Sequence, residues 1–475
     1  MKAGRLLQPT ASFLGPASFY RSALILVIPV MLQSFLTGFV SLVDNFMVAA
    51  LGDSKMAGVN VANQINFIYL VVINTACMAG GIYLSQHGGA GDREGMRQAF
   101  RFKLILALII SAAYTLICLF LAEPLIGLML GGNVQVDAIV EEGASYLRAV
   151  AASFIPIGIA AALSSSFRDI GITKVPLLVS VSAAFINTFL NWVLIYGNLG
   201  APRLEVTGAA IATVIARIFE AAAFLLMVKA IKPGWAIKAT ALFRINKNLF
   251  REILSKSGMM LFSETAWVVS ETVIVAIYNG RGGAETVAGM AAGFTIANLI
   301  FLVFPAIHTS TNVILGMTLG AGKLDEGRAK ARWILSGAVV LGFGALVAAC
   351  ASTLAIPLVF SNLSAEARGV TRGLVFVIGL YLPLWCFINA QFAISRAGGD
   401  MMMGVWVDVG ISYAVFIPSA ILIARLTSWG PVAIYGLAKL SDFPKAGVAV
   451  WWLRKEHWVK NLAAQSRDRS YQKSH

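Results

Sequence analysis

Apolar residues form long runs along this chain, and short polar segments separate the runs. Each run covers about 20 residues or more, which is the length a helix needs to cross the hydrocarbon core of a bilayer. We therefore predict twelve membrane-spanning helices, over residues 22–51, 56–86, 102–122, 143–167, 174–197, 208–231, 249–279, 286–318, 333–360, 370–395, 402–425 and 429–453. The last run differs from the others because Lys439, Asp442, Pro444 and Lys445 interrupt it.

Two carboxylates stand at matching points of the first and seventh of these runs. Asp44 lies in the first run, and Glu271 lies at the matching point of the seventh. A charged side chain at the centre of a membrane helix costs roughly 2.5–3.5 kcal/mol on insertion scales, so it is usually retained for an ion, a proton or a substrate. The two acids indicate a transporter.

The composition supports a membrane protein and excludes a soluble enzyme. Hydrophobic residues make up 58% of the 475 residues, charged residues make up 13%, and the mean hydropathy is +0.78. A soluble chain carries about 25% charged residues. Most gaps between the runs are short, which leaves no room for a second soluble domain. We predict an all-α integral membrane protein.

The net charge of +14 is explained by topology. Most of the 37 basic residues lie in the two tails and in the even-numbered loops. The positive-inside rule then places both termini in the cytoplasm of a multi-pass protein in the cell (inner) membrane. We expect no nucleic-acid partner. The four cysteines lie inside apolar runs without C-x-x-C spacing, so we interpret them as packing residues rather than as disulfide or metal ligands.

An internal repeat divides the chain into two halves. Residues 43–49 align with residues 270–276, and Gly89-Ala90-Gly91 aligns with Gly320-Ala321-Gly322. Two halves with the same helix order are related by a pseudo-two-fold axis along the membrane normal, and transporters of this kind bind substrate between the halves. We therefore predict two six-helix bundles.

The repeat also sets the domain boundaries that we expect. They are a cytoplasmic amino tail at 1–20, an N-lobe of helices 1–6 at 21–232, a cytoplasmic linker at 233–248, a C-lobe of helices 7–12 at 249–453 and a basic cytoplasmic tail at 454–475.

Several segments, in this order and spacing, resemble the multidrug and toxic compound extrusion (MATE) antiporters. They are the Pro29 to Asp44 helix, Leu51-Gly52, the 88–92 loop, its repeat at 320–323, the 208–213 helix start and the 396–400 loop. The resemblance runs from about residue 20 to Leu462. It implies twelve helices in two bundles around a V-shaped central cavity. It also implies export of organic cations or amphipathic drugs by alternating access, against entry of H⁺ or Na⁺.

The resemblance assigns an ion-coupling site to the N-lobe. The family's helix 1 acid matches Asp44, and its bend-forming proline matches Pro29. The helix 5 pair matches Asn187 and Asn191, where the proton-coupled branch has an acid at the second position, and the helix 6 threonine matches Thr213. The two asparagines are four residues apart and so face the same way.

A second ion-coupling site is expected in the C-lobe. Glu264 matches the helix 7 acid of the sodium-coupled branch, but the helix 10 acid of that branch has no counterpart within 370–395. Glu271 is seven residues after Glu264 and shares its face of the helix. We therefore expect Glu264 and Glu271 to bind H⁺ or Na⁺ together.

Other interpretations stay open at this point. In one interpretation, the acids Asp44, Glu264 and Glu271 have only structural roles. We also expect ion pairs toward the helix ends, formed by Arg217 with Glu220 and by Asp408. A flippase for lipid-linked saccharide and a membrane enzyme acting on lipid are the alternative functions. The enzyme would need a cluster of His, Cys or acidic residues at one interface, which the sequence lacks. We expect no catalytic residues, metal or cofactor beyond the coupling ion, and a monomer that contacts membrane lipid.

Overall fold

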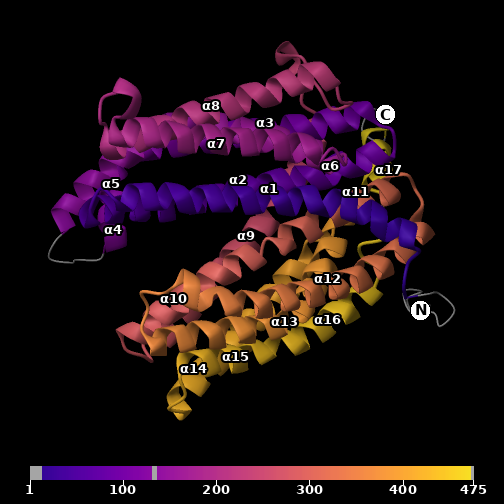
Figure 1. The fold of residues 1–475 in the computed structure, drawn as a ribbon. Helices are drawn as coiled ribbons and strands as arrows, with labels where there is room; N and C mark the ends of the chain where they lie inside the picture. Colours follow the sequence, from indigo (N-terminus) through magenta and orange to yellow (C-terminus); the bar gives the residue numbers. More distant parts are fainter. Residues whose placement is uncertain (1–12, 131–135, 472–475) are drawn as a thin grey trace. The chain divides into compact units, whose positions relative to one another are not determined.

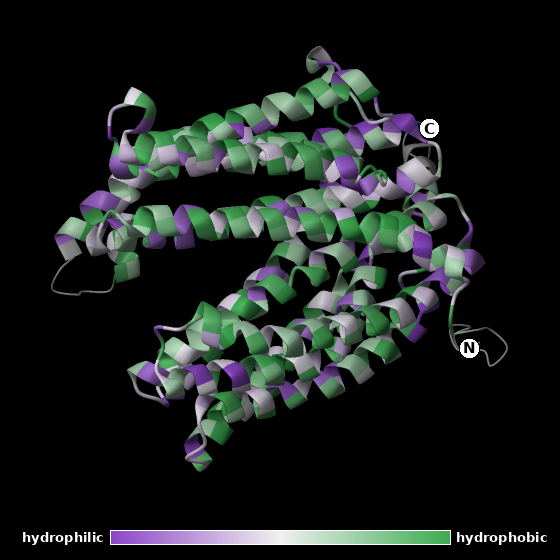
Figure 2. Ribbon diagram, in the orientation of Figure 1, coloured by the Kyte–Doolittle hydropathy of each residue, from purple (hydrophilic) through white to green (hydrophobic). Residues whose placement is uncertain are grey.

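The structure is a computed structural model that describes residues 13–130 and 136–471, and every regular element in these ranges is helical (Figure 1). Eleven of the described helices are long and apolar enough to cross a membrane. Hydrophobic residues follow the helices, and hydrophilic residues gather at helix ends and loops (Figure 2). Large side chains such as Leu354 and Leu358 are 83% exposed, as expected for helices that face lipid. The predicted all-α membrane fold is confirmed.

The twelfth predicted span is broken into pieces. Helix α15 (Pro431–Ala438) and helix α16 (Asp442–Arg454) are joined by one 3₁₀ turn, η7 (Lys439–Ser441). Each piece is too short to cross a bilayer by itself. The break falls at the charged residues that interrupt the apolar run, and Lys439, Asp442 and Lys445 are all buried within the protein.

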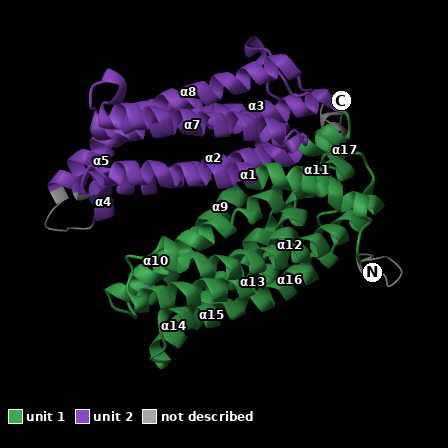
Figure 3. Ribbon diagram, in the orientation of Figure 1, with its two compact units in different colours: residues 1–31, 85–91, 258–475 green, residues 32–84, 92–257 purple. Residues whose placement is uncertain are grey.

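One compact unit comprises residues 32–84 and 92–257 (Figure 3). It contains the second part of α1 (Ala17–Ala49), most of α2 (Asp53–Gly89), α3 (Arg93–Phe120), α4 (Ala122–Leu130), α5 (Val136–Val150), η2 (Ala151–Ser153), α6 (Phe154–Asp169), α7 (Lys174–Tyr196), η3 (Asn198–Gly200), α8 (Glu205–Ile231), η4 (Ala239–Ala241) and the start of α9 (Lys247–Asn279). Aromatic side chains pack together in the interior of this unit. The Tyr69 ring stacks on Tyr114 with 4.6 Å between centroids, and the Tyr69 hydroxyl donates to the Phe154 carbonyl at 2.8 Å. We refer to this part of the chain as the N-unit.

The other compact unit comprises the described parts of residues 1–31, 85–91 and 258–475. It contains the start of α1, the end of α2, most of α9, α10 (Ala284–Ile300), α11 (Val303–Gly320), α12 (Leu324–Val359), α13 (Ala365–Ala397), η5 (Gly404–Val409), η6 (Ser412–Phe416), α14 (Ile417–Leu426), α15, η7, α16 and α17 (Leu462–Tyr471). Helix α13 is central, because it packs against α10, α11, α12, α15 and α16. Every fourth side chain from Leu374 to Ile394 is fully buried, which is the pattern of a helix face turned to the core. We refer to this part as the C-unit.

The glycine loops of the repeat have matching conformations. Gly91 and Gly322 both have left-handed backbone, with φ of +68° and +77°, which a glycine adopts without steric cost. Within the C-unit, a Cβ at Gly89 would lie 2.0 Å from a carbonyl oxygen of α11, and a Cβ at Gly320 would lie 1.9 Å from a carbonyl oxygen of α2. The repeated glycines therefore allow two helices to approach closely.

Candidate functional site

The N-unit brings the four predicted N-lobe residues to one place. Asp44 lies near the end of α1, Asn187 and Asn191 lie one turn apart on α7, and Thr213 lies on α8. In each case the side chain stands within an apolar helix, so its polar atoms need partners from neighbouring helices. The structure supplies those partners within the N-unit.

The Asp44 carboxylate accepts hydrogen bonds from α7. Thr188 Oγ1 donates to Asp44 Oδ1 at 3.1 Å. When the Asn187 amide nitrogen is turned toward Asp44, it donates to Oδ2 at 2.7 Å, and the amide oxygen accepts from the Thr213 N–H at 3.2 Å. This orientation suits an ionised carboxylate, because a carboxylate only accepts hydrogen bonds.

Thr213 and Asn191 complete this cluster. The side-chain amide of Asn187 lies 3.4 Å from Thr213 Oγ1 and 3.5 Å from Asn191 Nδ2. Asp44, the two asparagines and Thr213 therefore form one polar cluster that joins α1, α7 and α8.

Two further residues border this cluster and were not predicted from the sequence. Thr188 follows Asn187 directly, and Tyr146 of α5 is buried beside Thr213 and Asp44. Asn191 is also buried, and its Oδ1 has no hydrogen-bond partner among the described residues. The signal for Thr188 was a polar residue inside an apolar run, but its direction depends on how α7 is rotated.

A second polar chain lies nearby in the N-unit. Ser180 on α7 accepts a hydrogen bond from Gln33 at 3.1 Å and donates to Glu220 at 2.8 Å. Glu220 also pairs with Arg217 at 2.6 Å. The predicted pairing of Arg217 with Glu220 is confirmed.

The two predicted C-lobe acids each have a basic partner in the C-unit. Glu264 Oε1 lies 2.7 Å from Arg396 Nη2, and Glu271 Oε1 lies 2.6 Å from Lys439 Nζ. Their partners differ, so no direct bond joins the two acids among the described contacts. The sequence did not identify Arg396 or Lys439 as partners, and a joint cation site stays a prediction.

Helix α1 runs through Pro29 from Ala17 to Ala49. On the C-unit side, Val27 and Val30 pack with Ala306 of α11 in a small apolar cluster. Proline removes one backbone hydrogen bond from a helix interior and favours a kink there. A bending role for Pro29 remains a prediction.

Comparisons with known proteins agree with the sequence and the fold. Residues 29–193 match the MatE family model. The probable multidrug resistance protein NorM of Halalkalibacterium halodurans is 22% identical over 437 residues, which cover 91% of this chain and 93% of that protein.

Two solved structures share the fold. A MATE transporter of Vibrio cholerae superposes with a TM-score of 0.82 and 19% identity over 93% of this chain and 99% of that chain. A MOP superfamily transporter of Pyrococcus furiosus, described as having a binding pocket of reverse polarity that suggests a different function, superposes with a TM-score of 0.79 and 18% identity over 96% of this chain and 98% of that chain. The chain therefore belongs to the MATE family of multi-pass membrane transporters and has the MATE fold.

Proposed function

We propose that this transporter is a proton-coupled antiporter that exports organic cations or amphipathic drugs by alternating access. The observation that carries the proposal is the Asp44 carboxylate, which stands inside an apolar helix, accepts hydrogen bonds from the neutral donors Thr188 and Asn187 and has no ion pair among the described residues. A relative of nearly the same length is named a probable multidrug resistance protein, which supports drugs as the substrate class.

The hydrogen-bond donors around Asp44 favour H⁺ as the coupling ion. Thr188 and Asn187 both donate to the Asp44 carboxylate, and protonation of Asp44 turns one of its acceptor oxygens into a donor. Protonation therefore changes the bonds that join α1 and α7. Sodium would instead need several oxygen ligands at once, whereas Thr188 and Asn187 present donors to the carboxylate.

Exchange follows from competition at one acid. Ionised Asp44 attracts an organic cation electrostatically, and protonation of Asp44 removes that attraction. Binding of the cation and binding of the proton are then mutually exclusive, and repacking of α1 around Pro29 accompanies the change. We further propose that both termini lie in the cytoplasm, because most basic residues lie in the tails and even-numbered loops.

The flippase alternative gains no support from the buried lysines of the described residues. A site for a diphosphate group needs cations that are available to it. Lys103 lies 2.7 Å from Asp169, Lys439 lies 2.6 Å from Glu271, and Lys445 lies 2.9 Å from Asp408. Each of these ammonium groups already has a carboxylate.

Everted membrane vesicles test the proposal directly. We expect an acid-inside pH gradient to drive ethidium into vesicles that contain the wild-type protein, and an imposed Na⁺ gradient at uniform pH to drive none. Asp44→Asn should abolish the uptake at normal protein levels. The matched control is Glu123→Gln, because Glu123 is an exposed acid paired with Arg148 at the surface. Uptake by Asp44→Asn, or uptake driven by Na⁺ alone, would show the proposal to be wrong.

A further inference from the structure

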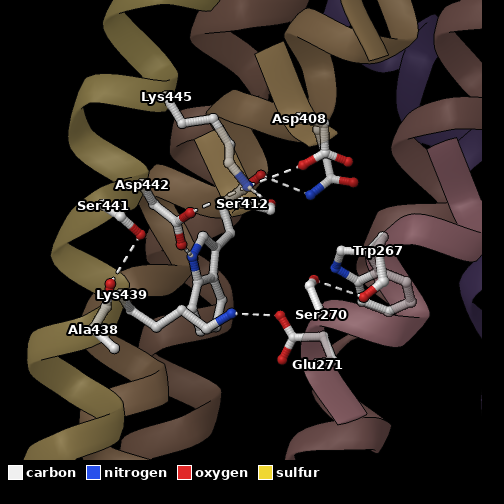
Figure 4. A network of polar contacts seen from close by, with 12 residues as sticks. Trp267, Ser270, Glu271, Asp408, Ser412, Ala438, Lys439, Ser441, Asp442 and Lys445 are labelled. Carbon is white, nitrogen blue, oxygen red and sulfur yellow. Dashed lines mark hydrogen bonds and ion pairs between the residues drawn. The ribbon is translucent and has the colours of Figure 1, made fainter. Parts of the chain in front are cut away.

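The C-unit contains a network of buried charges where its helices are irregular (Figure 4). The broken span α15–η7–α16 meets the π-helical segments η5 and η6, since η5 contacts α16 and η6 contacts η7. Discontinuous helices in membrane transporters commonly form ion sites, and π-helical turns often occur at functional sites. This junction therefore combines two features that are typical of ion sites in transporters.

The Lys445 ammonium group lies among three oxygen atoms. Its Nζ is 2.9 Å from Asp408 Oδ1, 3.3 Å from Ser412 Oγ and 3.5 Å from Asp442 Oδ1. An ammonium group has three hydrogens to donate, and it finds three acceptors here. Lys445, Ser412 and Asp442 are all buried, with exposed fractions of 8%, 2% and 6%.

A second ammonium group lies on the other side of the network. Lys439 Nζ is 2.6 Å from Glu271 Oε1 and 4.3 Å from the centre of the Phe416 ring. The other carboxylate oxygen of Asp442, Oδ2, accepts a hydrogen bond from Trp385 Nε1 at 2.7 Å. The network thus joins the carboxylates of Glu271, Asp408 and Asp442 with two ammonium groups.

The oxygen atoms around Lys445 form a donor set that a small cation would also accept. Two carboxylates and a hydroxyl are hard ligands of the type that binds alkali and alkaline-earth ions. A lysine ammonium carries the same charge as a free monovalent ion, and its covalent attachment keeps it beside its ligands at a high effective concentration. The tethered group therefore excludes a dissolved ion from these oxygens.

We propose that Lys445 is a tethered cation that permanently fills a monovalent-cation site formed by Asp408, Ser412 and Asp442. Its consequence is that this site of the C-unit takes up no exchangeable Na⁺ in the wild-type protein. Removal of the ammonium group should turn the same oxygens into a site for dissolved Na⁺. The inference concerns binding alone and does not require that Asp44 couples transport to protons.

Thermal unfolding of the purified full-length protein tests this inference. Lys445→Ala removes the ammonium group and leaves space for an ion, and Lys445→Arg keeps a cation in place. Unfolding temperatures are measured at pH 8 from 0 to 300 mM NaCl, with N-methylglucamine chloride keeping the ionic strength constant. We expect a flat response in the wild type and in Lys445→Arg. In Lys445→Ala we expect a lower unfolding temperature that rises with Na⁺ by about 3 °C to saturation.

Two further measurements separate a cation site from an ordinary ion pair. Ethylammonium chloride should also raise the unfolding temperature of Lys445→Ala, because it replaces the lost group. The Lys445→Ala/Asp408→Asn double variant should lose the response to Na⁺, because one ligand and one charge are gone. A Lys445→Ala protein that responds to neither Na⁺ nor ethylammonium would overturn the proposal. So would a wild type with the same Na⁺ response as the variant.

Poor folding of Lys445→Ala would still decide the question. The variant would then be extracted in 300 mM NaCl and, in parallel, in 300 mM N-methylglucamine chloride. Recovery of monodisperse protein in Na⁺ alone supports a vacated cation site. Equal recovery in the two salts, or no recovery in either, counts against it.

Discussion

Asn191→Asp tests how many protons one transport cycle uses. In the wild type, Asp44 is the one acid among the predicted N-lobe site residues, so we expect one proton per transport cycle. Exchange of one H⁺ for one monovalent organic cation moves no net charge across the membrane. One pH unit is worth about 1.4 kcal/mol per proton, so it should support about a tenfold substrate gradient. The membrane potential should contribute nothing to wild-type transport.

The position of Asn191 sets the size of the expected change. Its side chain is 3% exposed and its amide lies 3.5 Å from Asn187, whose amide donates to Asp44. Two carboxylates about 4 Å apart repel by about 4 kcal/mol at an effective dielectric constant of 20. That energy corresponds to roughly three pH units, so the pair should hold at least one proton at neutral pH.

A cation bound between the two carboxylates relieves their repulsion, so we expect cation binding to release the protons of both. The variant should then exchange two protons for one monovalent cation. The substrate gradient should then rise about 100-fold per pH unit, and 100 mV, worth about 2.3 kcal/mol for the extra charge, should add a factor of about 50. Proteoliposomes clamped with valinomycin and K⁺ allow the pH gradient and the potential to be imposed separately, with tetraphenylphosphonium as substrate. Asp44→Asn/Asn191→Asp is the matched control, because it restores a single acid. An unchanged dependence on potential in Asn191→Asp would show that residue 191 does not act with Asp44.

Two further predictions concern stability. Lys103→Met should lower the free energy of unfolding by about 3–5 kcal/mol, because Lys103 is fully buried and its ammonium group forms an ion pair with Asp169 at 2.7 Å, which the variant would break. Denaturant unfolding in detergent measures this loss, and Lys103→Met/Asp169→Leu should recover most of it; equal stability of wild type and single variant would contradict the reasoning. Gly320→Ala should cost about 1–3 kcal/mol, because its Cβ would lie 1.9 Å from a carbonyl oxygen. Gly258→Ala, which meets open space in a helix, should be neutral or slightly stabilising, so a similar loss in both alanine variants would refute the close-approach argument.

The sequence predicted those features that depend on local properties of the chain. The apolar runs identified the eleven long helices, because run length and hydropathy decide whether a segment crosses a bilayer. Asn187 and Asn191 could be placed on one helix face by their spacing. That Asp44 and Thr213 lie beside them followed from the family resemblance, since no local rule says which helices pack together.

Partners between distant helices could not be predicted in the same way. Arg396 was treated as a loop residue, but α13 carries it to Glu264 on α9. Lys439 and Lys445 were treated as interruptions of the twelfth run, because an insertion scale assigns every charge a cost without considering its partner. The break in that span, which places both lysines beside acids, depends on packing against η5, η6 and α9. Thr188 was missed for a related reason, since the rotation of α7 decides which side chain reaches Asp44.

The buried acids of the two units have different bonding partners, and this difference predicts which acids change protonation during transport. Asp44 is bonded by neutral groups, so gaining a proton requires only that Thr188 and Asn187 rearrange their hydrogen bonds. Glu271 is bonded to the Lys439 ammonium group, so protonating Glu271 would leave a cation unpaired in a poorly solvated interior. An unpaired buried charge costs several kcal/mol, which exceeds the roughly 1.4 kcal/mol that one pH unit supplies. Neutral partners therefore leave an acid free to exchange its proton, and cationic partners hold its charge fixed, which favours Asp44 over Glu271 as the acid that couples transport to the proton gradient.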